Sequence, residues 1–134
     1  MKMITRDTDY ALRAICFIAK NKNEIVSVDR LVEKIKIPRQ FCRKILQLLN
    51  KKRILASTKG AGGGFILAKP ANKIFLLDLM QIFQGPLKLS ECLLKKMQCP
   101  NIKSCPLRKK LNKIEDYVVE ELKSINIASL LEHK

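Results

Sequence analysis

A glycine-rich turn between two short apolar runs constrains the fold of this chain more strongly than any other feature. The stretch "RILASTKGAGGGFILAKP", residues 53–70, holds four of the five glycines in the 134-residue sequence. Glycine adopts positive φ without steric cost, so a run of glycines suits the tight connection of a β-hairpin. Ile54 and Leu55 form the apolar part of the first strand, and the residues from Phe65 to Leu67 form the apolar part of the second. The sequence therefore predicts strand, glycine turn, strand.

Three amphipathic helices are predicted ahead of this hairpin. Apolar residues recur at helical spacing within residues 7–21, 27–37 and 39–52. Ser27 suits the start of the second helix, and Pro38 suits the first turn of the third. Two short helices joined by a tight turn are typical of a helix-turn-helix, and a hairpin directly after the second of them is typical of a wing.

The charge of this region favours a polyanion as its partner. Residues 34–77 contain eleven Lys and Arg and no Asp or Glu. Such a stretch suits the phosphates of double-stranded DNA, while Arg, Lys and Gln also match the edges of guanine and adenine in the major groove. A basic face that only meets solvent is the alternative. The residues predicted to contact DNA from the third helix and the tip of the wing are Arg39, Gln40, Arg43, Lys44, Lys59 and Gly60.

A near-heptad stripe follows in the C-terminal part of the chain. Its apolar residues, spaced 4-3-4-4-3, are Leu107, Leu111, Ile114, Val118, Leu122 and Ile125. Such a stripe is too exposed for a small domain unless something covers it, and a second copy of the chain would do so. A twofold homodimer also suits a protein that binds a palindromic DNA operator. Packing of this helix on its own domain is the alternative.

Three of the five cysteines lie close together in "ECLLKKMQCPNIKSCPLRKK", residues 91–110. The spacing of Cys92, Cys99 and Cys105 matches neither the paired knuckles of zinc sites nor bacterial ferredoxins. A wider loop suits a larger group, and the neighbouring lysines would lower the thiol pKa values and offset an anionic cluster. We therefore predict an iron–sulfur cluster, with a redox switch of three free thiols as the alternative. Cys16 and Cys42 are expected to be small packing residues.

The remaining features exclude several classes of protein. The sequence has no run of 18 apolar residues, and its N-terminus has no apolar segment typical of a secretion signal. An odd number of cysteines argues against a framework of disulfides. No acid–base pair and no nucleophile beside a base can be recognised. We expect a cytoplasmic protein that is neither an enzyme nor bound to a membrane.

Taken together, these motifs resemble the Rrf-type winged-helix transcriptional regulators, the group of iron–sulfur regulators that includes IscR, NsrR and RirA. The resemblance covers nearly the whole chain and rests on "TDYALRA", "IPRQFCRKILQLLNKKRIL", "KGAGGGFILAKP" and the three-cysteine loop ahead of a long helix. It implies a repressor that dimerises by crossing its long C-terminal helices and holds its cluster with Cys92, Cys99 and Cys105. The positions that match DNA-contacting residues of the family are Gln40, Phe41, Arg43, Lys44 and Lys59.

The fourth cluster ligand departs from one branch of the family. IscR-like members have a histidine three residues after the last cysteine, where this sequence has Arg108, which stays protonated and does not ligate. NsrR-like members supply an aspartate from the other subunit, and Asp9 stands at the matching position, where its charge also suits a helix N-terminus. The cluster is expected to be 2Fe–2S or 4Fe–4S and to sense redox conditions, nitric oxide or iron status. The alternative is a cluster-free member that senses through its cysteine thiols or a metabolic-enzyme partner.

The predicted organisation has three parts in a mainly α fold with a small β-wing. Residues 1–84 form the winged helix-turn-helix domain, residues 85–106 form the cysteine-rich cluster-binding loop, and residues 107–134 form a dimerisation helix with a C-terminal tail.

Overall fold

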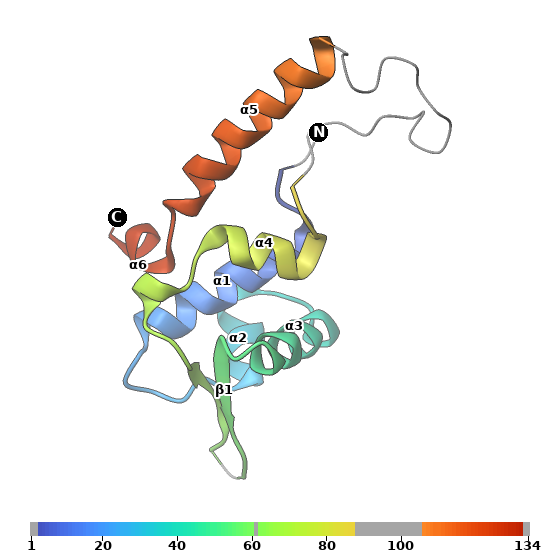
Figure 1. The fold of residues 1–134 in the computed structure, drawn as a ribbon. Coiled ribbons are helices and arrows are strands. Elements are labelled where there is room, and N and C mark those ends of the chain that lie inside the picture. Colours follow the sequence, from blue (N-terminus) through green and yellow to red (C-terminus); the bar gives the residue numbers. More distant parts are fainter. Residues whose placement is uncertain (1–2, 61, 88–105, 133–134) are drawn as a thin grey trace.

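The computed structural model describes residues 3–60, 62–87 and 106–132 as a mainly helical chain with one small antiparallel sheet (Figure 1). The elements in chain order are α1 (Arg6–Lys20), α2 (Val28–Ile35), α3 (Arg39–Lys51), β1 (Leu55–Thr58), β2 (Gly64–Leu67), the 3₁₀ turn η1 (Ala71–Lys73), α4 (Leu76–Gln84), α5 (Pro106–Lys123) and α6 (Ile127–Leu131). The predicted fold class, a winged helix-turn-helix followed by a long C-terminal helix, is confirmed.

Local sequence signals set where the first three helices begin. The side chain of Thr5 accepts a hydrogen bond from the backbone N–H of Thr8 and so caps α1. Ser27 caps α2 in the same way, by accepting from the N–H of Arg30 at 3.1 Å. Pro38 occupies the N-cap of α3, one residue ahead of the helical position predicted for it. The turn between α2 and α3 is short because Lys36 adopts a left-handed conformation with φ of 54°.

Helix α1 lies at the centre of the main hydrophobic core. Its small and branched residues Ala11, Ile15 and Ile18 are fully buried, and they pack with Leu46 and Leu49 on the inner face of α3. Burial of each large aliphatic side chain contributes about 1.5–3 kcal/mol, so this shared core holds α3 firmly on α1.

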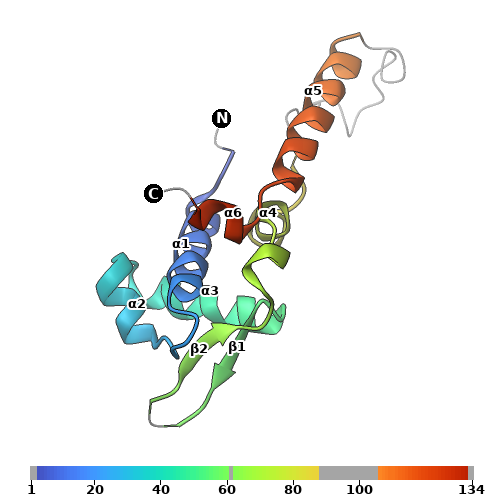
Figure 2. The same cartoon turned by 90° about the vertical axis from the view of Figure 1, so that its left-hand side faces the viewer.

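A second, smaller core joins α4 to α5. Leu76, Leu77 and Met80 from α4 enclose Leu122 from the last turns of α5. The rest of α5 projects away from the winged domain, as Figure 1 and Figure 2 show. Its exposed apolar residues are Leu107, Ile114 and Tyr117, with exposed fractions of 64%, 52% and 67%. None of the helices in the described ranges is long and apolar enough to cross a membrane.

The short helix α6 is an element that the sequence analysis does not predict. It begins with a capping box in which Asn126 and Ser129 exchange side-chain and backbone hydrogen bonds. The N–H of Ile127 donates to the carbonyl of Ile74 at 2.9 Å, and the Ile127 side chain is fully buried. The chain after α5 therefore returns to the winged domain and packs in the core around α1 (Figure 2).

The wing is the hairpin of β1 and β2, paired in the register Leu55 with Leu67 and Thr58 with Gly64. Two of the predicted positive φ values occur at its tip, at Gly60 (97°) and Gly62 (78°). Near the tip end of β2, Phe65 pairs with Val26 through two backbone hydrogen bonds of 2.8 and 3.0 Å, which fix the hairpin to the segment before α2.

Gly64 is required for a steric reason rather than for its φ. A Cβ atom at this position would lie 2.4 Å from the carbonyl oxygen of Val26 and 2.9 Å from the amide nitrogen of Ser27. Both neighbours are backbone atoms, so the wing and the chain before α2 would have to separate.

We predict that Gly64→Ala lowers the free energy of unfolding by about 1–3 kcal/mol, because overpacking here breaks the pairing of Val26 with Phe65. Urea unfolding at a fixed protein concentration measures this. The control is Gly62→Ala, where a Cβ has open space and only the positive φ is unfavourable. A Gly64→Ala protein as stable as the wild type would contradict this packing.

Candidate nucleic-acid interface

Helix α3 separates an apolar face from a face of hydrogen-bond donors. Cys42, Ile45, Leu46 and Leu49 are buried against the core. We call the opposite, exposed side the donor face of α3; it consists of Arg39, Gln40, Arg43, Lys44, Gln47 and Asn50. These residues recur every three or four positions, so they form one stripe along the helix.

Phe41 lies between these two faces and packs toward α1. Its ring centroid lies 6.2 Å from that of Tyr10, and the guanidinium carbon of Arg6 lies 4.4 Å above the ring. A guanidinium over an aromatic face is stabilising by about 0.5–1 kcal/mol when exposed. The half-buried Phe41 therefore helps to fix how α3 sits on the start of α1.

Arg39, the first residue of the donor face, is held by an acid from α2. Its guanidinium is ion-paired with the carboxylate of Asp29, and both side chains are largely exposed. Exposed pairs of this kind contribute at most about 1 kcal/mol, so an incoming anion can compete for Arg39 at small cost.

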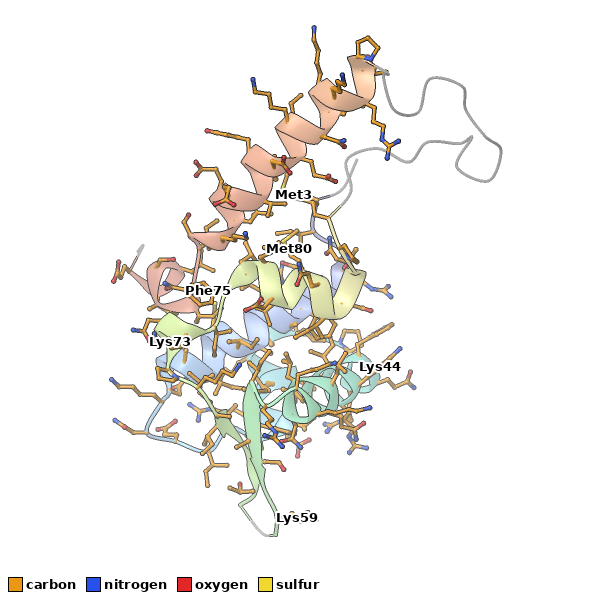
Figure 3. The ribbon with its side chains drawn as sticks, in the orientation of Figure 1. Met3, Lys44, Lys59, Lys73, Phe75 and Met80 are labelled. Atoms are coloured by element: carbon orange, nitrogen blue, oxygen red, sulfur yellow. The ribbon has the colours of Figure 1, made fainter. Side chains whose placement is uncertain are left out.

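The wing adds a second basic element at the end of the molecule opposite α5. Figure 3 shows Lys59 at the tip of the hairpin and Lys44 on α3, with the wing projecting beyond the helices. Lys59 and Gly60 are both exposed. The structure thus presents six of the seven predicted contact residues on exposed surface, and Phe41 as a half-buried residue against α1.

The predicted cluster ligands Cys92, Cys99 and Cys105 lie outside the described residues. Within the described ranges, no group of three or more His, Cys, Asp and Glu side chains is placed to hold a metal ion. Asp9 lies in the first turn of α1, where 41% of its side chain is exposed, and its carboxylate lies 3.1 Å from the Nε of Arg13.

The remaining cysteines behave as the sequence analysis predicts. Cys42 is buried, and Cys16 packs against the main core. Burial raises the pKa of both thiols above the ordinary value, although the charges of Lys20 near Cys16 and of Arg39 near Cys42 lower it in part. Both thiols are therefore protonated at neutral pH and are poor nucleophiles.

Sequence reasoning missed a hydrogen-bond network between the end of α4 and the start of α1. The side-chain oxygen of Gln84 accepts from the hydroxyl of Thr8 at 2.8 Å and from the backbone N–H of Thr5 at 3.0 Å. The Gln84 amide group in turn donates to the carbonyl of Met3 at 2.8 Å. These partners are 76 to 81 residues apart in sequence, and no local pattern reveals them. The network ties the residues just ahead of position 88 to the helix that carries Asp9.

We predict that Cys16 and Cys42 of the native protein are alkylated by iodoacetamide at pH 7 much more slowly than in the urea-unfolded chain. Because burial raises their pKa values, the rate in the folded protein should increase only at a higher pH than in the unfolded chain. Mass spectrometry of the labelled peptides measures this, with the unfolded protein as the control. Rapid labelling of Cys42 in the folded protein would contradict its burial.

Comparison of the sequence with known proteins places the chain among transcriptional regulators. The model of the Rrf2 family, described as iron-dependent transcriptional regulators, matches residues 4–133. A protein of Aquifex aeolicus whose name describes an HTH-type transcriptional regulator is 33% identical and is matched over 96% of this chain and 92% of its own length. The HTH-type transcriptional regulator NsrR of Oceanobacillus iheyensis is 30% identical, over 86% of this chain and 85% of its own.

Solved structures share the same fold. CymR, the global cysteine regulator of B. subtilis, superposes with a TM-score of 0.84 at 21% identity and covers 100% of this chain and 99% of its own. The IscR of T. potens gives a TM-score of 0.76 at 22% identity, covering 98% of this chain and 87% of its own. With a helix-turn-helix, a wing and a family match over nearly its whole length, this chain belongs to the Rrf2 family of transcriptional regulators.

Proposed function

We propose that this Rrf2-family regulator binds a palindromic DNA operator as a homodimer and represses transcription. We further propose that an iron–sulfur cluster, 2Fe–2S or 4Fe–4S, controls its affinity for DNA. The ligands would be Cys92, Cys99 and Cys105, with Asp9 of the partner subunit as the fourth. The observation that carries the proposal is the donor face of α3 beside a basic wing, in a stretch of 44 residues without an acid.

The dimensions of α3 suit the major groove of DNA. From Gln40 to Asn50 the donor face extends about 15 Å along the helix axis, and a major groove about 12 Å wide accepts a helix of this size. Arg43 lies in the middle of the face and suits bidentate contact with guanine, while Gln40 and Gln47 suit adenine. Lys44 and Lys59 suit phosphates, and Gly60 allows the wing backbone to approach DNA closely. Phe41 would contribute indirectly, because it fixes the position of α3 on α1.

The exposed apolar surface of α5 supports a second copy of the chain as the dimer partner. Leu107, Ile114 and Tyr117 are each more than half exposed, and α5 contacts its own domain mainly near its C-terminal end. A helix of 18 residues is about 27 Å long, which is sufficient for an extended helix–helix interface. A twofold pair would present two copies of α3 to two half-sites.

The described residues fit a cluster only as the source of one ligand. Asp9 offers an oxygen donor that is partly exposed, and its ion pair with Arg13 is weak enough for it to exchange that partner. The thiolate donors come from the sequence at positions 92, 99 and 105. When bound, such a cluster would supply chemistry that responds to oxygen, nitric oxide or iron supply. The hydrogen bonds of Gln84 would then connect the end of α4, next to the cysteine segment, with the helix that carries Asp9.

We predict different losses from removing a base contact and a phosphate contact. Arg43→Ala should cost about 1–3 kcal/mol on a promoter duplex that the protein protects, and much less on random duplex of equal length. Lys59→Ala should weaken binding to both duplexes by a similar factor. Fluorescence anisotropy at one fixed salt concentration measures both. Equal losses on the two duplexes for Arg43→Ala would refute its role in reading bases.

We predict that protein purified without oxygen contains iron and acid-labile sulfide, and that Cys99→Ala loses most of both. Cys16→Ala is the matched control, because Cys16 packs against the main core and its replacement should leave the iron content unchanged. Iron and sulfide assays with absorption spectra measure this. If Cys99→Ala retained the wild-type iron content, the proposed ligand set would be wrong. An iron-free wild type whose DNA affinity still responds to thiol oxidation would favour the cluster-free alternative.

A further inference from the structure

Arg53 occupies a backbone position that normally belongs to glycine. Its φ is 62°, in the left-handed region, where a non-glycine residue costs about 1–2 kcal/mol. The N–H of Arg53 donates to the carbonyl of Asn50 at 3.0 Å, and the N–H of Ile54 donates to that of Leu49 at 3.0 Å. These two bonds form a Schellman motif that ends α3, and glycine is the usual residue at the left-handed position of this motif. Folding alone would therefore favour glycine at position 53.

Arg53 is one of the residues that line an open hollow between α3 and the wing. The hollow has a volume of about 530 Å³, and its polar lining comes from Asn50, Arg53, Ser57 and Lys69. Asn50 is the last residue of the donor face of α3, Ser57 belongs to β1, and Lys69 follows β2. The described residues that line it include two cations, an amide and a hydroxyl, and no carboxylate.

This lining has the chemistry of a phosphate site. A guanidinium and an ammonium group supply the charge, and the amide and hydroxyl supply further donors. The hollow is lined by Asn50 from the donor face of α3 and by Ser57 from the wing, and it is open to solvent. An open hollow between two elements that would both contact DNA suits one phosphate of a long backbone better than a small free anion, which requires enclosure.

We propose that Arg53 and Lys69 bind a phosphate of the DNA backbone at the junction of α3 and the wing. The inference rests on the proposed binding of DNA by these elements. The contact fixes the angle between the helix in the major groove and the wing, since one phosphate is held from both elements. It also gives a reason for an arginine in a conformation that favours glycine, because the arginine side chain can contact a phosphate and glycine cannot.

The left-handed backbone makes Arg53→Gly an unusually clean test. Glycine adopts φ of 62° without cost, so this variant should unfold at the same or a higher urea concentration than the wild type. Its affinity for DNA should nevertheless fall about tenfold, by similar factors on a promoter duplex and on random duplex, because a phosphate contact carries no sequence information. The slope of log K against log salt should become shallower by about 1.8 for the dimer, because each protomer loses one phosphate contact that contributes about 0.9. Lys69→Gln should change affinity and slope in the same direction.

The matched control is Lys113→Gln on α5. It removes the same unit of charge from an exposed position on the helix that projects away from the wing (Figure 1). Its affinity and salt slope should stay at wild-type values. Inorganic phosphate, compared with chloride at matched ionic strength, should stabilise the wild type and Arg53→Gly equally.

Three results would overturn the inference. Wild-type affinity and slope in Arg53→Gly, with Arg43→Ala still weakened, would remove the phosphate site and leave DNA binding intact. An equal loss in Lys113→Gln would reduce the effect to net charge. Stabilisation by inorganic phosphate that disappears in Arg53→Gly would make the hollow a site for a small anion. A wild type that binds neither duplex at low salt would instead refute the proposed function itself.

Discussion

The packing of α3 on α1 is the interaction on which the rest of the structure depends. Leu46 and Leu49 on the inner face of α3 pack in the core around Ile15, so the donor face on the opposite side points to solvent. Phe41, under Arg6 and beside Tyr10, fixes the same helix near its N-terminal end. Without this packing, the donors of α3 would have no common direction and the wing would have no fixed relation to them.

Helix α1 also brings together features that belong to different parts of the proposed function. Asp9 lies in the first turn of α1, and the guanidinium of Arg6 packs over the ring of Phe41 from α3. The hydroxyl of Thr8 belongs to a fully buried residue; it donates to the side-chain oxygen of Gln84, at the end of α4, at 2.8 Å and lies 3.1 Å from the hydroxyl of Thr5. A displacement at the end of α4 would therefore break hydrogen bonds at the start of α1.

Much of the fold could be predicted because its signals are local. Ser27 predicts the start of α2, and the glycines of the wing predict the turn of the hairpin in which they lie. The alternation of apolar and basic residues in α3 likewise predicts which face is buried. The interactions that were missed are long-range or concern backbone conformation. Gln84 meets Thr5 and Thr8 only after the chain has folded, and no propensity suggests a left-handed Arg53. Helix α6 is too short for its pattern to stand out, although its capping residues Asn126 and Ser129 were visible in the sequence.

In the proposed function, the surface formed by α3, the wing and their junction binds the phosphates of double-stranded DNA. The most direct test is the salt dependence of the affinity of wild-type protein for a promoter duplex. If several basic residues per protomer contact phosphates, log K should fall linearly with log salt, with a slope steeper than about −4 for a dimer. An affinity that hardly changes between low and high salt, or no binding at low salt, would contradict the binding of DNA phosphates by this surface.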